Sequence, residues 1–365
     1  MTKTTPGKLA VWALAAIALF MLPLLLQATG SNSWVRIVDL ALLYVLLALG
    51  LNIVVGYAGL LDLGYIAFFA VGAYIYGLLA SPHLADTFPA IQAMFPNGLH
   101  VNIWLVMLLA AVVAGVVGML LGAPTLKLRG DYLAIITLGF GEIIRIFMLN
   151  LDRPVNITNG PKGIAQIDPL TVFGFNMGQR HTMTIGDWSY TIQPVTLYYY
   201  LFLFFVILSI VLSYRLQDSR VGRAWMAIRE DEIAAKAMGL NTRNLKLLAF
   251  GMGATFGGMS GVLFASFQRF VSPESFSLME SVMVVAMVVV GGIGHIPGVI
   301  LGALLLAGLP EVLRHVAGPL TELTGGRLGP EILRQLLIAL AMVVVMLLRP
   351  KGLWPAPEHG KSLAK

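Results

Sequence analysis

The stretch IWLVMLLAAVVAGVVGMLLG, residues Ile103–Gly122, determines the fold class because it contains no charged residue. A helix of about 20 apolar residues is long enough to cross the hydrocarbon core of a bilayer. The rest of the chain has the same character: 58% of its residues are hydrophobic, 12% are charged, and the mean hydropathy is +0.84. Soluble domains carry roughly 25% charged residues. The sequence therefore predicts an integral membrane protein.

Further apolar runs on both sides of this stretch predict an all-α fold, a polytopic transmembrane helical bundle of about ten spans. The eighth and ninth runs are short and enclose GGIGHIPG, which is typical of broken or re-entrant helices. The first run is interpreted as a retained helix because it is long for the apolar part of a signal peptide. The predicted spans are Leu9–Leu26, Ile37–Val54, Leu60–Ala80, Ile103–Gly122, Tyr132–Asn150, Val195–Tyr214, Leu245–Phe267, Leu278–Val290, Val299–Leu313 and Glu331–Leu348.

Lysine and arginine are unevenly distributed among the connecting segments. If the N-terminus is cytoplasmic, the inside segments hold the denser set, including Lys3, Lys8 and the cations of the loop 215–246. Such residues favour the cytoplasmic side, so the N- and C-termini and this loop are predicted to be cytoplasmic. Residues 1–355 then form a single transmembrane domain and 356–365 a short cytoplasmic tail.

The basic balance and the cysteine count exclude several classes of protein. The pI of about 9.5 follows from membrane orientation and from contact with anionic membrane lipid, so it indicates no nucleic-acid partner. The absence of cysteine excludes disulfides, thiolate catalysis and cysteine-based metal sites. The histidines and carboxylates show no metal-binding spacing. We therefore predict no metal, no cofactor and no catalytic residue.

Between the sixth and seventh spans lies GRAWMAIREDEIAAKAMG, residues Gly222–Gly239, within the charge-rich loop 215–246. Its alanines predict one short helix, and Ile233, Ala237 and Leu240 share one face of that helix. Gly239 suits a left-handed C-cap. Thr242 is predicted as the N-cap of the next span. The small side chains favour docking into a groove of another protein over a position on the lipid headgroups, because alanine partitions weakly into lipid.

The predicted periplasmic segment 151–194 is rich in turn formers and ends in WSYTIQ, a predicted short strand. A connection of this length is often functional. Two interpretations stay open: a cap that packs on the helix ends, or a docking surface or lid over a substrate path.

Four ionisable residues within the predicted spans are candidates for function, because charges in lipid indicate function by default. They are Asp62, Glu142, Arg145 and Glu280. Glu142 and Arg145 lie three residues apart on one helix, so they are predicted to form an ion pair. Asp62 and Glu280 lie near span ends, where contact with water is expected. An acid and a cation could together bind a zwitterionic substrate.

The pattern VVGxxG occurs twice, at Val54–Gly59 and at Val289–Gly294. Paired glycine interruptions in corresponding helices mark substrate paths in transporters that contain internal repeats. Chance similarity in a chain rich in glycine and valine is the competing interpretation. The residues predicted to line a translocation path are Asn52, Asp62, Glu142, Arg145, Gly291 and Gly294.

The order Ala234-Ala235, three residues, Gly239 resembles the EAA loop of ABC-importer permeases, the coupling helix that seats in a cleft of the ATPase. The glutamate of that motif would align with Ile233, whereas Glu232 lies one position earlier. The resemblance implies an ATPase-coupling role for Arg229, Glu230, Asp231, Glu232, Ala234, Ala235 and Gly239.

Other segments are similar to the LivM-type permease of branched-chain amino acid ABC importers, over residues 35 to 355. They are LGLNIVVGYAGLLDLGY (Leu49–Tyr65), GAPTLKLRGDYLAIITLGFGEIIR (Gly122–Arg145), TNGPKGI (Thr158–Ile164), Ser272–Pro297 and RPKGLW (Arg349–Trp354). In TNGPKGI, Asn159 stands where the family pattern has a glycine.

The resemblance implies a bacterial inner-membrane subunit that works by alternating access with a LivH-type permease, two cytoplasmic ABC ATPase subunits and a periplasmic substrate-binding protein. The chain contains no GxxxxGK[ST] phosphate loop, so ATP hydrolysis is expected in another chain. Within the family, a urea or amide permease is the alternative. An ion-coupled secondary amino-acid transporter is the alternative of another class, and an intramembrane enzyme is disfavoured because catalytic side chains are not clustered.

Overall fold

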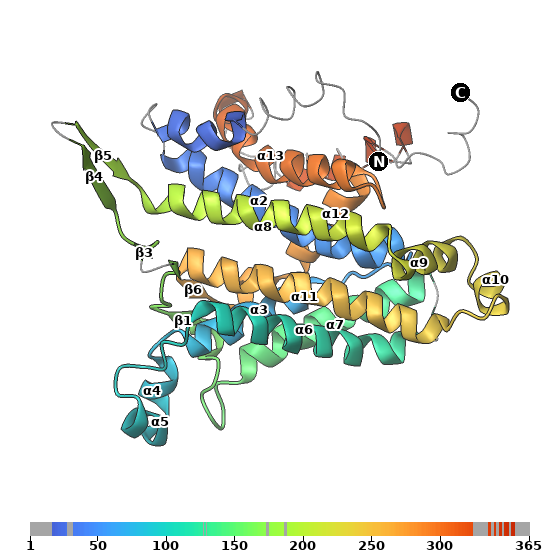
Figure 1. The fold of residues 1–365 in the computed structure, drawn as a ribbon, viewed down its shortest axis with the longest axis horizontal. Helices are drawn as coiled ribbons and strands as arrows, with labels where there is room; N and C mark the ends of the chain where they lie inside the picture. Colours follow the sequence, from blue (N-terminus) through green and yellow to red (C-terminus); the bar gives the residue numbers. More distant parts are fainter. Residues whose placement is uncertain are drawn as a thin grey trace.

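The structure, a computed structural model, describes residues 17–27, 32–126, 128, 130–172, 175–185 and 188–323, and then 335–336, 339–340, 343–344, 347–349 and 352–354. These residues form mainly helices that run side by side (Figure 1). Among the described residues, five helices are long and apolar enough to cross a membrane: α2 (Asn32–Asn52) with its π-helical extension η1 (Ile53–Tyr57), α6 (Ile103–Thr125), α7 (Asp131–Asn150), α8 (Pro194–Gln217) and α11 (Thr242–Gln268).

Shorter apolar helices are also present among the described residues. They are Ile17–Gln27, α3 (Ile66–Leu79), α12 (Leu278–Gly291) and the first part of α13 (Ile296–Leu323). The helical class and the short eighth span are thus confirmed. The number of ten spans and the cytoplasmic side of the termini stay predictions.

Three span predictions need comment. The third span begins at Ile66 and not at Leu60, because Gly59 has a φ of 69° and the Asp62 side chain accepts a hydrogen bond from Gly64 N at 2.9 Å, which competes with helix formation. The ninth is not short: it belongs to the 28-residue helix α13. The tenth, predicted at 331–348, lies outside the described residues apart from the short pieces.

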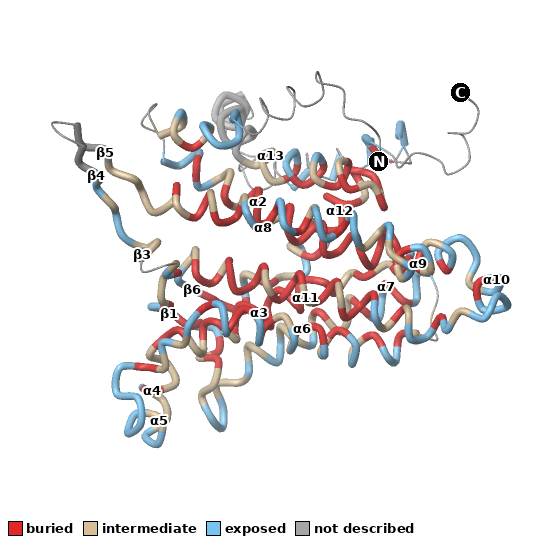
Figure 2. Tube along the Cα trace, in the orientation of Figure 1, coloured by how far each residue is buried: buried red, intermediate tan, exposed pale blue. Residues whose placement is uncertain are grey.

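The helices approach closely because small residues face each other at their crossings. A methyl group added to Gly72 on α3 would lie 2.0 Å from the carbonyl oxygen of Gly258 on α11, and one added to Gly118 on α6 would lie 2.5 Å from Ala254 Cβ. Small residues at such crossings let backbones pack directly. Helix α11 is therefore buried along much of its length between α3 and α6 (Figure 2).

Beside the helices, connecting segments at one end of the bundle form short antiparallel strands (Figure 1). The strand predicted from WSYTIQ is confirmed as β5 (Trp188–Ile192), which pairs with β4 (His181–Ile185). The remaining pairs are β1 (Ile164–Ala165) with β6 (Phe270–Val271) and β2 (Thr171–Val172) with β3 (Phe175–Asn176). The short helices at this end are α4 (His83–Thr87), α5 (Pro89–Met94), η2 (Gly160–Lys162) and η3 (Pro273–Phe276).

Part of the long segment packs on the helix ends, as the cap interpretation requires. Asp168 N donates to Ala80 O at 2.8 Å, and Leu170 N donates to the Tyr198 hydroxyl at 3.1 Å. Ile167 is fully buried. The β4–β5 hairpin instead projects from the bundle (Figure 1). The helices α9 (Arg220–Glu230) and α10 (Glu232–Ala237) lie at the opposite end.

Candidate functional site

The charged loop folds as a helical hairpin, α9 followed by α10, and not as the single helix that its alanines predict. The break is at Asp231, whose backbone is extended (φ −152°, ψ 109°). Its side chain accepts hydrogen bonds from Ile233 N at 2.8 Å and Ala234 N at 3.0 Å, so it caps α10. Arg229 and Glu230 consequently belong to the end of α9. The predicted coupling residues are divided between two helices.

Helix α9 is anchored firmly to the bundle. Trp225 is completely buried, and its indole N–H donates to Leu245 O at 2.7 Å. A methyl group on Gly222 would lie 2.1 Å from Leu216 O, so only glycine permits this close approach to the end of α8. Ser219 caps the helix by accepting from Gly222 N at 3.1 Å. These contacts fix the hairpin to α8 and α11.

Helix α10 carries one inward and one outward face. Ala235 is buried, and the Glu232 carboxylate binds Lys246 Nζ at 2.7 Å, which ties α10 to α11. This ion pair gives the displaced glutamate an intramolecular partner. The outward face, which we call the α10 face, consists of exposed residues: Ile233, Ala234, Ala237 and Met238.

Ile233 is 69% and Met238 84% exposed, so apolar side chains project beyond the bundle at this end. Gly239 ends α10 with a φ of 87°, which confirms the predicted left-handed C-cap. The predicted N-cap of α11 is wrong by one residue: Asn241 caps it by accepting from Asn244 N at 3.1 Å, and Thr242 is the first helical residue. Ala234 thus belongs to the α10 face and Ala235 does not.

The two VVGxxG segments lie against each other. Asn52 Oδ1 accepts a hydrogen bond from Gly294 N at 2.9 Å, and a methyl group on Gly56 would lie 2.9 Å from Gly294 Cα. The Arg229 guanidinium donates to Gly56 O. Gly291 packs against α13, where an added methyl would lie 2.3 Å from Gly298 O. We call Asn52, Gly56, Gly291, Gly294 and Arg229 the helix joint.

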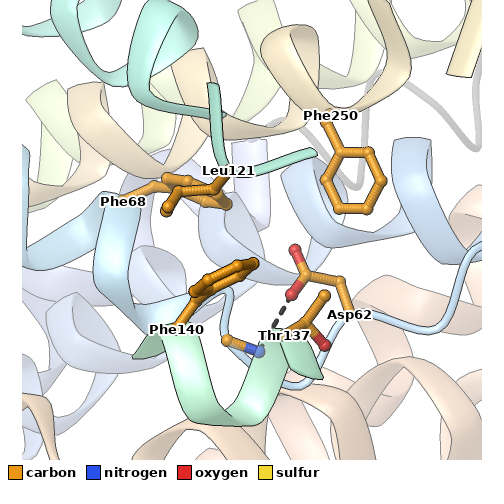
Figure 3. Close-up of a pocket in the computed structure, with 7 residues that line it drawn as sticks. Asp62, Phe68, Leu121, Thr137, Phe140 and Phe250 are labelled. Atoms are coloured by element: carbon orange, nitrogen blue, oxygen red, sulfur yellow. Dashed lines mark hydrogen bonds between the residues drawn. The ribbon is translucent and has the colours of Figure 1, made fainter. Parts of the chain in front are cut away.

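Asp62 lies in the irregular segment between η1 and α3. It is 1% exposed and therefore not in water, contrary to the prediction from its place near a span end. One oxygen accepts from Gly64 N, while Oδ2 has no hydrogen-bond partner among the described residues. Figure 3 shows the carboxyl group facing the space enclosed by apolar side chains. That cavity, about 10 Å³ in volume, is lined by Asp62, Gly64, Phe68, Leu121, Thr137, Phe140 and Phe250.

The irregular segment reaches the middle of α7. Leu63 N donates to Thr137 Oγ1 at 3.0 Å, and Gly64 Cα would lie 3.0 Å from a methyl group on Gly141. At 1.5 Å per residue, these α7 residues lie about 9–15 Å from its first residue. Ser281 Oγ donates to Leu63 O. Non-helical backbone at this depth is tolerated where protein groups satisfy it or where it lines a cavity.

Glu142 and Arg145 form the predicted ion pair on α7. Arg145 Nε donates to the two carboxylate oxygens at 2.9 and 3.0 Å. Their side chains are 34% and 26% exposed, so the pair lies at the edge of the bundle. Glu142 lines a second small cavity with Leu138, Gly141, Leu63, Ile66, Phe276, Leu278 and Ser281. Glu280 accepts a hydrogen bond from the Tyr44 hydroxyl at 2.7 Å.

The predicted path residues are therefore not one site. Asn52, Gly291 and Gly294 belong to the helix joint, whereas Asp62 and Glu142 lie on either side of the contact between the irregular segment and α7.

A further buried acid, Asp39 on α2, is absent from the predicted set. It is fully buried, and neither of its oxygens has a hydrogen-bond partner among the described residues. It is the sole charged residue in its predicted span, which is the signal that could have identified it.

The segment RPKGLW also takes part in the structure. Leu353 N donates to Val290 O at 2.8 Å, and Trp354 N donates to Gly291 O at 3.0 Å. These carbonyl groups end α12, where no intrahelical donor remains. His295 Nδ1 lies 2.9 Å from Trp354 O, so the GGIGHIPG turn and the chain near its C-terminus hold each other.

The long apolar helices and their close packing define a multi-pass helical membrane protein. A family model for the branched-chain amino acid transport system / permease component matches residues 33–346. The chain therefore belongs to this permease family, as its motifs predict.

Individual relatives agree with this assignment. The chain is 41% identical to the high-affinity branched-chain amino acid transport system permease protein LivM of Escherichia coli strain K12, over 92% of this chain and 75% of that protein. The LivM protein of Salmonella typhimurium strain LT2 is 40% identical over the same shares. The LivH permease protein of E. coli is 27% identical over 89% of this chain and 95% of its own length. No solved structure matches the chain.

Proposed function

We propose that this chain is the transmembrane permease subunit of an ABC importer that carries branched-chain or related amino acids across the bacterial inner membrane. The family match supports the transport role and the substrate class. A permease subunit is not itself an enzyme, and the sequence holds no phosphate loop of the GxxxxGK[ST] type. The ATPase subunits that power transport are therefore separate chains.

The observation that carries the coupling mechanism is the α10 face. Ile233 and Met238 project from a hairpin that is fixed to the bundle by Trp225, with exposed charged residues around them. Exposed apolar residues rimmed by polar ones are typical of protein-binding surfaces. The α10 face thus docks into a cleft of an ATPase subunit. Closure of the ATPases moves the hairpin, and the helices attached to it alternate between outward-open and inward-open arrangements.

The complete transporter then contains a second, LivH-type permease, two ATPase subunits and a periplasmic substrate-binding protein. Similarity of this chain to both LivM and LivH proteins supports a pair of related permeases. The projecting β4–β5 hairpin lies at the end opposite α10, which suits contact with a binding protein outside the membrane.

The test replaces Ala234 with Trp, which adds a large side chain to the α10 face without touching the inward face. We expect the Ala234→Trp permease to reach the membrane but to lose most ATPase subunits in co-purification and most amino-acid uptake. The matched control is Ala227→Trp, the same change at an exposed position of α9. If the Ala234→Trp protein retains its ATPases and its uptake, the docking assignment is wrong. Uptake driven by an ion gradient in ATP-depleted vesicles would instead support a secondary transporter.

Asp62 is the acid of the proposed translocation path. Its buried carboxyl group faces a mainly apolar cavity, and this combination suits the ammonium group and the branched side chain of the substrate. The cavity, about 10 Å³, corresponds to roughly one water molecule, so substrate passage requires the irregular segment and α7 to separate. Uptake by an Asp62→Asn permease tests this role.

A further inference from the structure

The Arg229 side chain points away from the α10 face and into the helix joint. A methyl group added to Gly59 would lie 2.8 Å from Arg229 Cγ, and one added to Gly294 would lie 2.8 Å from Arg229 Nη1. The same Nη1 donates a hydrogen bond to Gly56 O. The glycines of the two VVGxxG segments thus leave the space that this side chain occupies. A single arginine contacts both helix breaks.

The position of the guanidinium follows from helix electrostatics. Gly56 lies in the last turn of the helix Asn32–Tyr57, where carbonyl groups lack intrahelical donors. The C-terminus of a helix carries partial negative charge, so a cation there is favourable. Helix α12 also ends nearby, at Gly291, three residues before Gly294. Arg229 therefore lies at the C-terminal ends of two helices at once.

These two helix ends already touch without Arg229. The Asn52 side chain accepts a hydrogen bond from Gly294 N at 2.9 Å. The backbones of Gly56 and Gly294 also pack directly, since a methyl group on Gly56 would lie 2.9 Å from Gly294 Cα. The main chain of Leu353 and Trp354 closes the remaining end of α12. Asn52 thus holds the two helix breaks together, and Arg229 attaches that unit to α9.

The attachment is not needed to hold α9 in place. Trp225 and Gly222 fix the helix to α11 and α8, and Arg229 is exposed over much of its surface. Loss of its guanidinium removes one charged hydrogen bond and little buried apolar area. The effect of that loss should appear in how the hairpin and the helix ends move together.

We propose that Arg229 is a positioning residue that transmits displacement of the α9–α10 hairpin to the C-terminal ends of α2–η1 and α12. This inference rests on the proposed ATPase docking of the α10 face. Arg229 is two residues before the Asp231 break, so it is the last long side chain of α9 directed at the joint before the chain turns to the ATPase. Movement of the hairpin pulls the two helix ends as one body, and the irregular segment after η1 moves with them.

The experiment compares Arg229→Met with Arg223→Met in the complete transporter, reconstituted in proteoliposomes with its ATPases and its binding protein. Methionine keeps an unbranched stem against Gly59 but removes the guanidinium. Arg223 is the matched control because it is exposed on the same helix, where it bonds locally to Asp218 O. Measured quantities are bound ATPase, ATP hydrolysis and amino acid imported per ATP hydrolysed.

We expect Arg229→Met to keep its ATPases and their hydrolysis while import per ATP falls roughly tenfold, the scale of losing one hydrogen bond of a charged donor. Arg223→Met should import normally, and Arg229→Lys should recover part of the loss because lysine still presents a cation to Gly56 O. Asn52→Ala should also lower import per ATP, and adding it to Arg229→Met should have less than its separate effect, because both act on one joint.

Unchanged import per ATP in Arg229→Met would overturn the inference. So would loss of the ATPases from this variant, because Arg229 would then act in docking. Failure of the docking proposal itself is recognised separately, since Ala234→Trp would retain its ATPases and uptake whatever Arg229 does.

Discussion

A methyl group added to Gly291 at the helix joint would lie 2.3 Å from the carbonyl oxygen of Gly298, whereas one added to Gly139 on α7 would meet no atom within 4 Å. The joint is closed by backbone contacts, by the hydrogen bond from Gly294 to Asn52, and by Arg229. Helix α7, in contrast, has only four buried residues: Leu133, Ala134, Thr137 and Gly141. The joint is closely packed, whereas most of the α7 surface is not covered by other described residues of the chain.

The charged residues of α7 indicate what kind of environment covers its exposed surface. Glu142 and Arg145 are partly exposed near the middle of a spanning helix, and charged groups in hydrocarbon are costly. The exposed surface of α6, by contrast, consists of residues such as Leu105, Leu108 and Leu120, which suit lipid. We therefore expect the edge of α7 that carries the pair to be covered by the second permease or by water of the path.

The largest effect should come from the same substitution placed in each region. Gly291→Leu forces a side chain into backbone atoms of α13, so it should lower the stability of the chain by about 3 kcal/mol, the upper part of the range for overpacking. Gly139→Leu should change it by less than about 0.5 kcal/mol. Thermal unfolding of each purified subunit in detergent measures both. Equal losses would show that α7 is as closely packed as the joint.

Co-purification of the second permease with the Gly139→Leu subunit tests what covers α7. If Gly139→Leu leaves the subunit stable but prevents co-purification of the second permease, the open surface of α7 is the permease interface. Normal assembly would place lipid or water at Gly139.

The next largest effect should distinguish the roles of Asp62 and Glu142, which lie on either side of the contact between the irregular segment and α7. Asp62→Asn keeps an acceptor for Gly64 N and replaces a buried ionisable group with a neutral amide, so stability should hold or rise. Uptake should fall about tenfold if the group binds the substrate ammonium. Glu142→Gln instead leaves Arg145 unpaired, which should lower stability by about 1 kcal/mol, less than for a buried pair.

Uptake rates and unfolding temperatures measured on the two variants test these assignments. The Asp62→Asn permease should lose uptake but keep its unfolding temperature, whereas the unfolding temperature of the Glu142→Gln permease should fall. Normal uptake by Asp62→Asn would remove Asp62 from the path. The double change Glu142→Gln with Arg145→Gln should be more stable than Glu142→Gln alone, since no charge is then left without its partner.

The sequence predicts most helices because uninterrupted apolar residues leave the backbone no other stable form in lipid. The family is also predictable, since local motifs carry it. The Asp231 break was not, because an alanine-rich run resembles one continuous helix until the Asp231 side chain is seen to cap its second half. Helix propensity alone therefore does not predict the break at Asp231.

The helix joint shows the other limit of the sequence. The VVGxxG pattern is visible twice in the sequence, but the contact between the two segments joins residues 242 positions apart, from Asn52 to Gly294. No local pattern specifies that pairing. The direction of Arg229 depends on the same pairing, because its acceptor Gly56 lies 173 positions away. The contacts of this predicted coupling residue therefore could not be read from its own helix.

The smallest effect should come from an exposed pair outside both regions. His100 Nδ1 contacts the Asp168 carboxylate, and Nε2 lies 2.6 Å from Asn97 O, so both ring nitrogens face acceptors and the imidazolium is favoured. The hydrogen bond with Asp168 raises the pKa of His100 above its ordinary 6.5. The folded state therefore binds the proton more tightly, and this stabilisation is complete below pH 6.5 and is lost as the pH rises through the folded-state pKa.

The pair is about half exposed on the His100 side, so its contribution should stay below about 1 kcal/mol. His100→Gln, which does not titrate, should remove this part of the pH dependence of the unfolding temperature while leaving uptake unchanged. Because Gly291 and Gly139 carry no ionisable group and lie away from this pair, their substitutions should leave the pH dependence as it is. A pH dependence that survives His100→Gln would have to come from another titrating group.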